Sequence, residues 1–407
     1  MKHPRLSILA WSLYDFANTI FAMNVVSYNF ALWITDTHGT DDLAYSLALS
    51  ISTAVVALAV PLLGAISDRY DRRMPYLRGY TLGCVLFTML LGTVKHASTA
   101  LIFFSIANAC FQISNIFYNA LIPQISTKGR MGRMSGIGTG TGYIGAIIGL
   151  IIVKPFKDVG GYQAAFIPTA LCLLLFALPC LILIRDPSSG PARVTPRDFV
   201  RGWKKVSQTF RDARKYSSFF LLLLSSFLVL NAINTIIAFM SVYAQKVVGF
   251  TDENIFFFMI ICTLFAVVAS FVFGFVSDRL GALRTLKWTL GVWILAVVGG
   301  IFATTQAALW MIGPLVGIAL AGTWVTSRVV VAELAPRRKT GEFFGLFGLA
   351  GRFSAILGPL VWGVTTWLFS SLGVMRYRIA LGAMLVFILL GLRILRRVRM
   401  PEVENTR

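Results

Sequence analysis

Two polar residues one helical turn apart stand inside the first apolar run of this chain, where they could do chemistry. Asp15 lies roughly 13 Å along a helix from the start of the run, and Asn18 follows on the same face. A charged Asp at mid-membrane costs on the order of 3 kcal/mol, so it usually faces a cavity or a partner. The pair predicts either a satisfied structural contact or a site for a proton or a substrate amine.

Four amides form a stripe in a later apolar run, over residues 98–123. Asn108, Gln112, Asn115 and Asn119 follow one another at steps of four, three and four residues, so they share one helical face. Amides among hydrocarbon need hydrogen-bond partners from protein or water. The stripe therefore predicts either hydrogen bonds between helices or the lining of a polar cavity, and we adopt the cavity as the prediction.

The second half of the chain offers a comparable set. Asn231 and Asn234 stand at a place comparable to the polar pair of the first run, and a later run holds Trp324 and Arg328. Arg328 is roughly 8 Å from the end of its run, close enough to reach the surface. Arg352 is roughly 15 Å deep, so it needs a counter-ion or an anionic ligand. A direct pair between Arg352 and the acid of the first run stays open.

The composition indicates that the elements carrying these residues are membrane-spanning helices. The 407 residues are 57% hydrophobic and only 13% charged, with a mean hydropathy of +0.76, whereas a soluble globule carries roughly a quarter charged residues. A helical span needs about 20 apolar residues, and the alternating strands of a β-barrel are absent from the sequence. We predict an all-α integral membrane protein with twelve spans, near residues 6–35, 43–67, 76–94, 98–123, 133–153, 163–184, 217–246, 253–276, 283–304, 308–332, 342–370 and 376–396.

The basic residues give these spans a direction. Of the 37 Lys and Arg residues, 29 fall on the side of the predicted membrane that holds both termini. The positive-inside rule places both termini in the cytoplasm, and we expect a plasma (inner) membrane protein. The net charge of +20 follows from this topology and predicts attraction to anionic lipid rather than nucleic-acid binding. Six basic residues fall on the outer side: Lys95, Lys154, Lys157, Lys246, Arg376 and Arg378.

A short motif, which we call the gate motif, occurs twice at the ends of apolar runs. The first copy contains Gly64, Asp68, Arg69, Arg72 and Arg73, and the second, 210 residues later, contains Gly274, Asp278 and Arg279. Its Asp can accept hydrogen bonds from the start of a neighbouring helix, and its Arg residues can pair with carboxylates or lipid phosphates. Another pair of similar stretches, near residues 136 and 345, keeps a step of 209 residues. These offsets predict a duplicated half and a gate on the cytoplasmic side.

The duplication predicts a six-helix bundle over residues 1–185, a cytoplasmic linker over 186–216, and a second bundle with a basic tail over 217–407. The linker pattern predicts a basic amphipathic helix on the inner leaflet. Gly138, Gly142, Gly145 and Gly149 share one face, which favours tight helix packing over a nucleotide-binding loop. The five scattered cysteines are expected to be reduced packing residues, and no residue spacing indicates a metal or another cofactor.

The gate motif resembles the cytoplasmic Gly-x-x-x-Asp-Arg-x-Gly-Arg-Arg motif of the major facilitator superfamily, with Asp71 standing where glycine is usual. Residues 14–18, 118–123 and 342–359 resemble the vacuole-effluxer-like branch, which includes fungal autophagy-linked amino-acid effluxers. The resemblance implies two six-helix bundles related by a pseudo-two-fold axis along the membrane normal. It also implies alternating access around a path lined by the first, fourth, seventh and tenth helices.

These observations predict a secondary active transporter, not an enzyme, for a small polar or zwitterionic solute such as an amino acid. The sequence has no ATP-binding motif, so uphill transport would use an ion gradient, with Asp15 as the first candidate for proton coupling. Two other functions stay open: a broad exporter of amphipathic compounds, and a non-transporting sensor on the same fold. The expected partners are the lipid bilayer, the substrate and protons, and we expect a monomer.

The gate motif generates a contact prediction. We expect Asp68 near the start of the eleventh helix, around residues 341–343, and Asp278 near the start of the fifth, around residues 130–133. Both contacts should tighten when the cytoplasmic side closes, because the field at a helix end falls off within about one turn. A structure of the outward-open state checks this. Either carboxylate lying more than about 10 Å from its helix start would contradict the prediction, by the same short range.

Overall fold

The computed structural model describes residues 4–70, 73–119, 121, 131–185, 204, 207–208, 210–211, 214–335 and 340–400. These residues form long helices joined by short connections, and no strand occurs among them. Ten of the described helical stretches are long and apolar enough to cross a membrane. Helices α4 and α7 are further long helices outside that set, and together the described helices are consistent with the predicted twelve spans.

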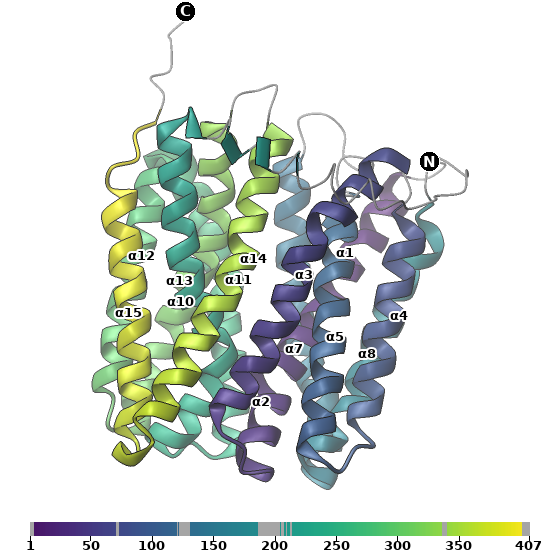
Figure 1. Cartoon of the computed structure of the whole chain (residues 1–407), viewed down its shortest axis with the longest axis vertical. Coiled ribbons are helices and arrows are strands. Elements are labelled where there is room, and N and C mark those ends of the chain that lie inside the picture. The colour runs from purple at the N-terminus through teal and green to yellow at the C-terminus, as the bar shows by residue number, and fades with distance from the viewer. Residues whose placement is uncertain are drawn as a thin grey trace, which may run out of the picture.

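The first half begins with one continuous helical rod made of α1 (Pro4–Phe21), η1 (Ala22–Asn29), α2 (Phe30–Leu32) and η2 (Trp33–Thr37). It continues with α3 (Asp42–Tyr70), α4 (Met74–Leu91), α5 (Ala97–Asn119), α7 (Met131–Ala164) and α8 (Phe166–Leu183). The second half holds α10 (Ser217–Val248), α11 (Asp252–Leu280), α12 (Ala282–Phe302), α13 (Gln306–Leu334), α14 (Thr340–Leu368), η3 (Ser370–Leu372) and α15 (Met375–Leu395). Helix α1 begins, and α15 ends, at the same end of the molecule (Figure 1).

The two halves repeat one packing pattern. In the first half α1 packs on α7 and α8, and α4 packs on α5; in the second, α10 packs on α14 and α15, and α12 packs on α13. The two bundles lie side by side (Figure 1) and meet mainly through α3 against α14 and α7 against α11. This arrangement confirms the predicted all-α fold of two pseudo-symmetric six-helix bundles.

Glycine lets the helices within each bundle approach closely. A Cβ added at Gly145 of α7 would lie 2.5 Å from the Phe16 carbonyl oxygen of α1. The second half contains a similar close approach. Gly358 of α14 stands 209 residues after Gly149 of α7, and a Cβ added to it would lie 2.3 Å from the backbone carbonyl oxygen of Asn231 on α10. Small residues at these positions permit backbone contact that larger side chains would prevent.

The first membrane helix is wound as a π-helix over η1. The Phe30 amide donates to the Val25 carbonyl, five residues back, instead of four. This wider winding leaves backbone carbonyls for other partners. The Ser27 carbonyl accepts a 2.8 Å hydrogen bond from the Ser241 hydroxyl of α10, in the other bundle, and the Val26 carbonyl accepts one from the Tyr45 hydroxyl of α3. The irregular helix therefore contributes directly to contact between the bundles.

Much of the predicted gate lies outside the described residues. This holds for Arg72, for the side chains of Asp68 and Arg69, for the surroundings of Gly64, and for most of the linker. The described backbone shows that α3 and α11 continue through the motif to Tyr70 and Leu280, rather than ending at its first glycine. Gly281 then ends α11 with a φ of 86°, a conformation that favours glycine. The predicted contacts of Asp68 and Asp278 stay predictions.

The close approach of α7 to α1 generates a stability prediction. We expect Gly145→Ala to lower the free energy of unfolding by about 1–3 kcal/mol, because the new methyl group must push two helix backbones apart. Gly140→Ala is the matched control, since an added Cβ there meets nothing within 4 Å. Thermal unfolding of both variants in detergent checks the prediction. Equal melting temperatures for the two variants would show that the contact does not limit stability.

Candidate functional site

Asp15 lies half-buried at the interface between the bundles. Its Oδ2 atom is 3.3 Å from the position of an added Cβ on Gly142, so the carboxylate packs against the glycine face of α7. It interacts electrostatically with Arg328 of α13, in the other bundle, and with the side chains of Tyr118 and Tyr143. The acid therefore has an oppositely charged neighbour that approaches from the second half of the chain.

An aromatic wall stands beside this pair of charges. The Tyr118 ring stacks between Trp11 and Tyr14, with centroid separations of 4.8 and 4.9 Å. The Tyr14 hydroxyl is held at 2.6 Å from the Thr81 hydroxyl, whereas the buried Tyr118 hydroxyl has no hydrogen-bond partner among the described residues. Stacking thus fixes the Tyr118 ring while its hydroxyl keeps an unused capacity to donate and to accept.

The amide stripe of α5 makes most of its contacts within the first bundle. Asn108 donates to the Ser52 hydroxyl at 2.8 Å, and Gln112 donates to the Thr53 hydroxyl at 2.9 Å, so both connect α5 to α3. Further along α5, Asn115 accepts a 2.7 Å hydrogen bond from the Asn18 amide of α1. These three contacts are hydrogen bonds between helices, and the predicted lining of a polar cavity stays a prediction.

Exposure changes along the same stripe. Asn108 is buried, Gln112 and Asn115 are half-buried, and Asn119 is exposed. Asn119 still donates to the Asn115 carbonyl at 2.8 Å. The stripe thus becomes more accessible toward the end of α5 that lies on the same side as the beginning of α1 (Figure 1).

Arg352 of α14 also reaches into the opposite bundle. Its Nη1 atom is 3.4 Å from the backbone carbonyl oxygen of Gln112, on α5. The sequence leaves a direct Asp15–Arg352 pair open, but the electrostatic partner found for Asp15 in the second bundle is Arg328. Each of these deep charges therefore faces protein of the other bundle, at two separate points.

Two amides lie on α10, the helix of the second bundle whose packing corresponds to that of α1. Asn231 is fully buried and donates to the Phe227 carbonyl at 2.7 Å, while its Oδ1 atom has no hydrogen-bond partner in the described part of the chain. Asn234 is half-buried, and its Nδ2 atom is 3.4 Å from the Ser354 hydroxyl of α14. Trp324 is half-buried four residues before Arg328 and shares its face of α13.

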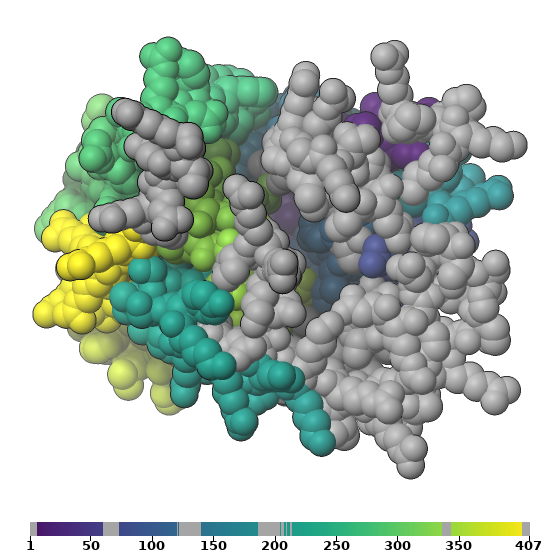
Figure 2. Space-filling view, turned by 90° about the horizontal axis from the view of Figure 1, so that it is seen from above, coloured from purple at the N-terminus to yellow at the C-terminus, as the bar shows by residue number. Residues whose placement is uncertain are grey.

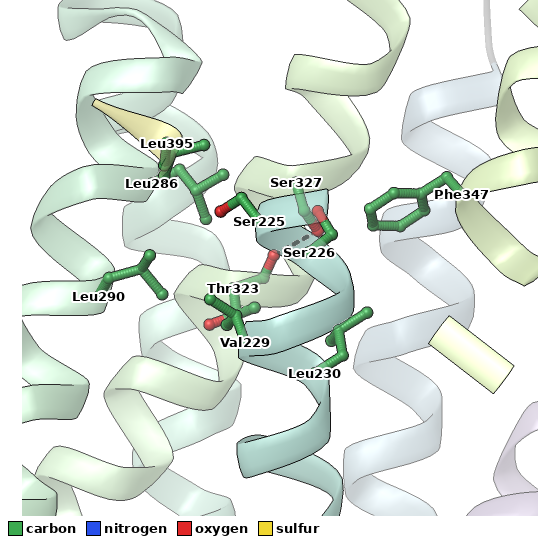
Figure 3. A pocket seen from close by; sticks show the side chains of 10 residues that line it. All are labelled: Ser225, Ser226, Val229, Leu230, Leu286, Leu290, Thr323, Ser327, Phe347 and Leu395. Carbon is green, nitrogen blue, oxygen red and sulfur yellow. Dashed lines mark hydrogen bonds between the residues drawn. The ribbon is translucent and has the colours of Figure 1, made fainter. Parts of the chain in front are cut away.

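A small cavity is lined by residues of the second bundle (Figure 3). Its hydroxyl groups donate to backbone carbonyls, as in the 2.8 Å bond from Ser225 to Gly391 and the 2.6 Å bond from Ser327 to Thr323. The lining consists of Ser225, Ser226, Val229, Leu230, Leu286, Leu290, Thr323, Ser327, Phe347 and Leu395. None of the predicted site residues lines it, but Ser327 directly precedes Arg328 on α13 and Leu230 directly precedes Asn231 on α10.

Charged residues that the sequence analysis did not assign to the site join the two bundles at the end opposite the start of α1. Lys157 of α7 pairs with Asp252 of α11, and Asp36 of η2 pairs with Lys246 of α10 at 2.9 Å. Both pairs join the two bundles. The available signal was that Lys157 and Lys246 are two of only six basic residues predicted on the outer side. Figure 2 views the molecule from the end where α1 begins and α15 ends. From this end, atoms that lie deeper in the molecule are visible between the two halves.

The described residues offer no metal centre. No group of three or more His, Cys, Asp or Glu side chains among them could hold a metal ion. The cysteines in this part of the chain are all free, and each is buried or half-buried. The chemistry available at the site is therefore that of charges, amides and phenols.

The comparisons with known proteins agree with this architecture. The chain matches the sequence model of the Major Facilitator Superfamily over residues 15–359 and 257–407. It is 26% identical over 419 residues to the MFS-type transporter YxiO of Bacillus subtilis, covering 98% of this chain and 95% of that one. It is 22% identical over 370 residues to Autophagy-related protein 22 of Kluyveromyces lactis, covering 82% and 75%.

Solved structures share the fold. A mutant of the nucleoside transporter NupG superimposes with a TM-score of 0.74 at 14% identity, over 96% of this chain and 99% of that one. A bacterial homologue of the human lysosomal transporter Spinster, in an inward-facing and unoccupied conformation, gives a TM-score of 0.72 at 16% identity over 96% of each chain. The chain belongs to the Major Facilitator Superfamily and is a multi-pass membrane transporter rather than an enzyme, which confirms the resemblance drawn from its sequence.

Proposed function

We propose that this protein is a proton-coupled secondary transporter of a small zwitterionic solute such as an amino acid, working by alternating access. The observation that carries the proposal is the electrostatic interaction of Asp15 and Arg328 across the bundle interface. A carboxylate and a guanidinium match the two charged ends of a zwitterion, and they belong to the two bodies that must move relative to each other. The phenol of Tyr118 supplies a further hydrogen-bonding group.

The same arrangement supports a coupling role for Asp15. A zwitterion would replace the interaction of Asp15 with Arg328 by an amine contact to the acid and a carboxylate contact to Arg328. Protonation of Asp15 would weaken the acid's attraction for either cation. A ligand or a proton can shift the transport equilibrium only by binding one state more tightly than the other, and this exchange provides such a difference. We propose Asn18, Asn115, Asn119, Asn234 and Trp324 as further residues of the pathway.

The proposal also covers the orientation of the protein in the membrane and its oligomeric state. Helix α1 begins and α15 ends at one face, and most basic residues were assigned to that side. We propose that this face is cytoplasmic, in a plasma membrane, and that the protein works as a monomer. The relatives named Autophagy-related protein 22 support an effluxer of amino acids as the working assignment. An exporter of amphipathic compounds is less well supported, since amides and charges accompany the aromatic wall.

A thermal-shift screen identifies the solute class. Purified protein is heated with amino acids, organic acids, sugars, nucleosides or amphipathic drugs in turn. We expect zwitterionic amino acids to raise the melting temperature, because a ligand present at 100 times its dissociation constant stabilises the native state by about 2.7 kcal/mol. Stabilisation by drugs alone would favour the exporter function instead.

Asp15→Asn tests the role of the acid with the amino acid that gives the largest shift. The substitution keeps size and hydrogen bonding but removes titration. If Asp15 couples protons, proteoliposomes with this variant should exchange labelled substrate but fail to concentrate it against a gradient. If Asp15 binds the amine, exchange itself should fail. Asp158→Asn is the matched control, because Asp158 forms its ion pair with Lys154 of the same helix. Full uphill transport by Asp15→Asn would exclude both roles.

Single cysteines along the amide stripe test the pathway. In a background without the native cysteines, we expect reactivity toward a small polar thiol reagent to rise from position 108 to position 119. The reason is that Asn108 is buried and Asn119 is exposed. Substrate should protect positions 115 and 119. Equal inertness at all four positions would show that the stripe serves only to join helices.

A further inference from the structure

Helices α3 and α11 each carry an acid at their outer end as well as at their inner end. Asp42 is the first residue of α3, and Asp252 is the first residue of α11. They stand 210 residues apart, the same step that separates the inner acids Asp68 and Asp278 of the gate motif. These two helices are also the ones that meet the opposite bundle, α3 against α14 and α11 against α7. The duplication therefore repeats an outer acid together with the inner motif.

The outer acid of α11, Asp252, forms hydrogen bonds and a salt bridge with residues of the first bundle. The Tyr28 hydroxyl of η1 donates to the Asp252 carboxylate at 2.7 Å and lies 2.9 Å from its backbone carbonyl. Lys157 of α7 forms a salt bridge with the other carboxylate oxygen and donates to the Tyr28 hydroxyl at 2.6 Å. Asp252 thus binds two residues of the opposite bundle, one of them a cation.

Lys157 is unusual among these residues because it is almost completely buried. Its side chain is 4% exposed, whereas that of Asp252 is 39% exposed. The ammonium also lies 4.5 Å from the centroid of the Tyr28 ring and 5.6 Å from that of Tyr162. Breaking such a pair leaves a buried charge without its counter-ion, which is strongly unfavourable. The contact therefore favours the state in which the outer ends stay together.

The outer acid of α3, Asp42, has neighbours of the same kinds, but its contacts are looser. Asp42 is 6% exposed and interacts electrostatically with Arg376 of α15 and, more weakly, with Lys246 of α10. The Trp362 indole of α14 lies close to the carboxylate, although Asp42 Oδ2 and Trp362 Nε1 both remain outside hydrogen-bond geometry. Tyr377 is also within electrostatic range of Asp42. An acid of one bundle again faces a cation and a tyrosine of the other.

We propose that Asp42 and Asp252, with Arg376 and Lys157 of the opposite bundles, form a two-copy outer latch that holds the outer face closed. The outer latch is the counterpart, on the same two helices, of the inner gate motif. Each of α3 and α11 would therefore present one acid to the opposite bundle when the outer side is closed and another when the inner side is closed. This inference rests on the proposed alternating-access cycle.

Distance measurements between spin labels test the outer latch without any substrate. Labels on cysteines at His96 and Thr304, both exposed in outer connections of opposite bundles, report the separation of the outer ends. We expect Asp252→Asn to raise the fraction with separated outer ends by about tenfold or more, because it leaves the buried Lys157 without its counter-ion. Lys157→Gln should act in the same direction, because it also removes the salt bridge between the bundles. Asp42→Asn should act in the same direction with a smaller effect, because its contacts are looser.

Two further variants separate a latch from general loss of structure. Asp158→Asn should change the distance distribution much less than Asp252→Asn, since Asp158 forms its ion pair with Lys154 of the same helix and acts on Lys157 only at longer range. Exchanging the charges, with Asp252→Lys and Lys157→Asp in one protein, should return the distribution toward that of the parent. If Asp252→Asn cannot be purified as a folded protein, Asp42→Asn and the exchanged pair carry the test. Unchanged distributions in the folded Asp42 and Asp252 variants would overturn the latch and leave the transport proposal untouched.

Discussion

The structure depends on one constraint: charges and amides placed within the bilayer must find partners inside the protein. Here several of those partners come from the other bundle. Asp15 faces Arg328, and the Arg352 guanidinium lies 3.4 Å from the carbonyl oxygen of Gln112. At the end of the interface where α11 begins, Lys157 pairs with Asp252. In the proposed alternating-access cycle these contacts join bodies that separate and meet again, so the groups that satisfy the constraint would also define the states.

The backbone prepares these contacts. Glycines on α7 bring that helix against α1, and Gly142 leaves room for the Asp15 carboxylate. The π-helical η1 carries both Tyr28, which binds the outer acid, and the Ser27 carbonyl, which accepts a hydrogen bond from α10. A regular α-helix would rotate the residues beyond it relative to their present positions. Helix irregularity and small residues therefore set where the two bundles touch.

Sequence reasoning reached the fold because hydropathy, basic-residue asymmetry and the offset of 210 residues are properties of the chain itself. It also identified Asp15, Arg328 and Arg352, since a charge in an apolar run is conspicuous. It did not pair Asp15 with Arg328, or Lys157 with Asp252, because contacts between bundles depend on how two folded bodies meet. The amide stripe shows the same limit: spacing placed Asn108 on one face of its helix, but only the tertiary structure supplies Ser52 as its partner.

The central claim is that one solute bridges Asp15 and Arg328 through its two charged ends. Equilibrium binding of a labelled amino acid to the purified protein tests it most directly, with competition by the matching amine that lacks the carboxylate and the matching acid that lacks the amine. The account predicts that the intact amino acid competes and that each analogue is weaker by about tenfold or more, since each makes only one of the two charge contacts of the site. Equal competition by either analogue would contradict it.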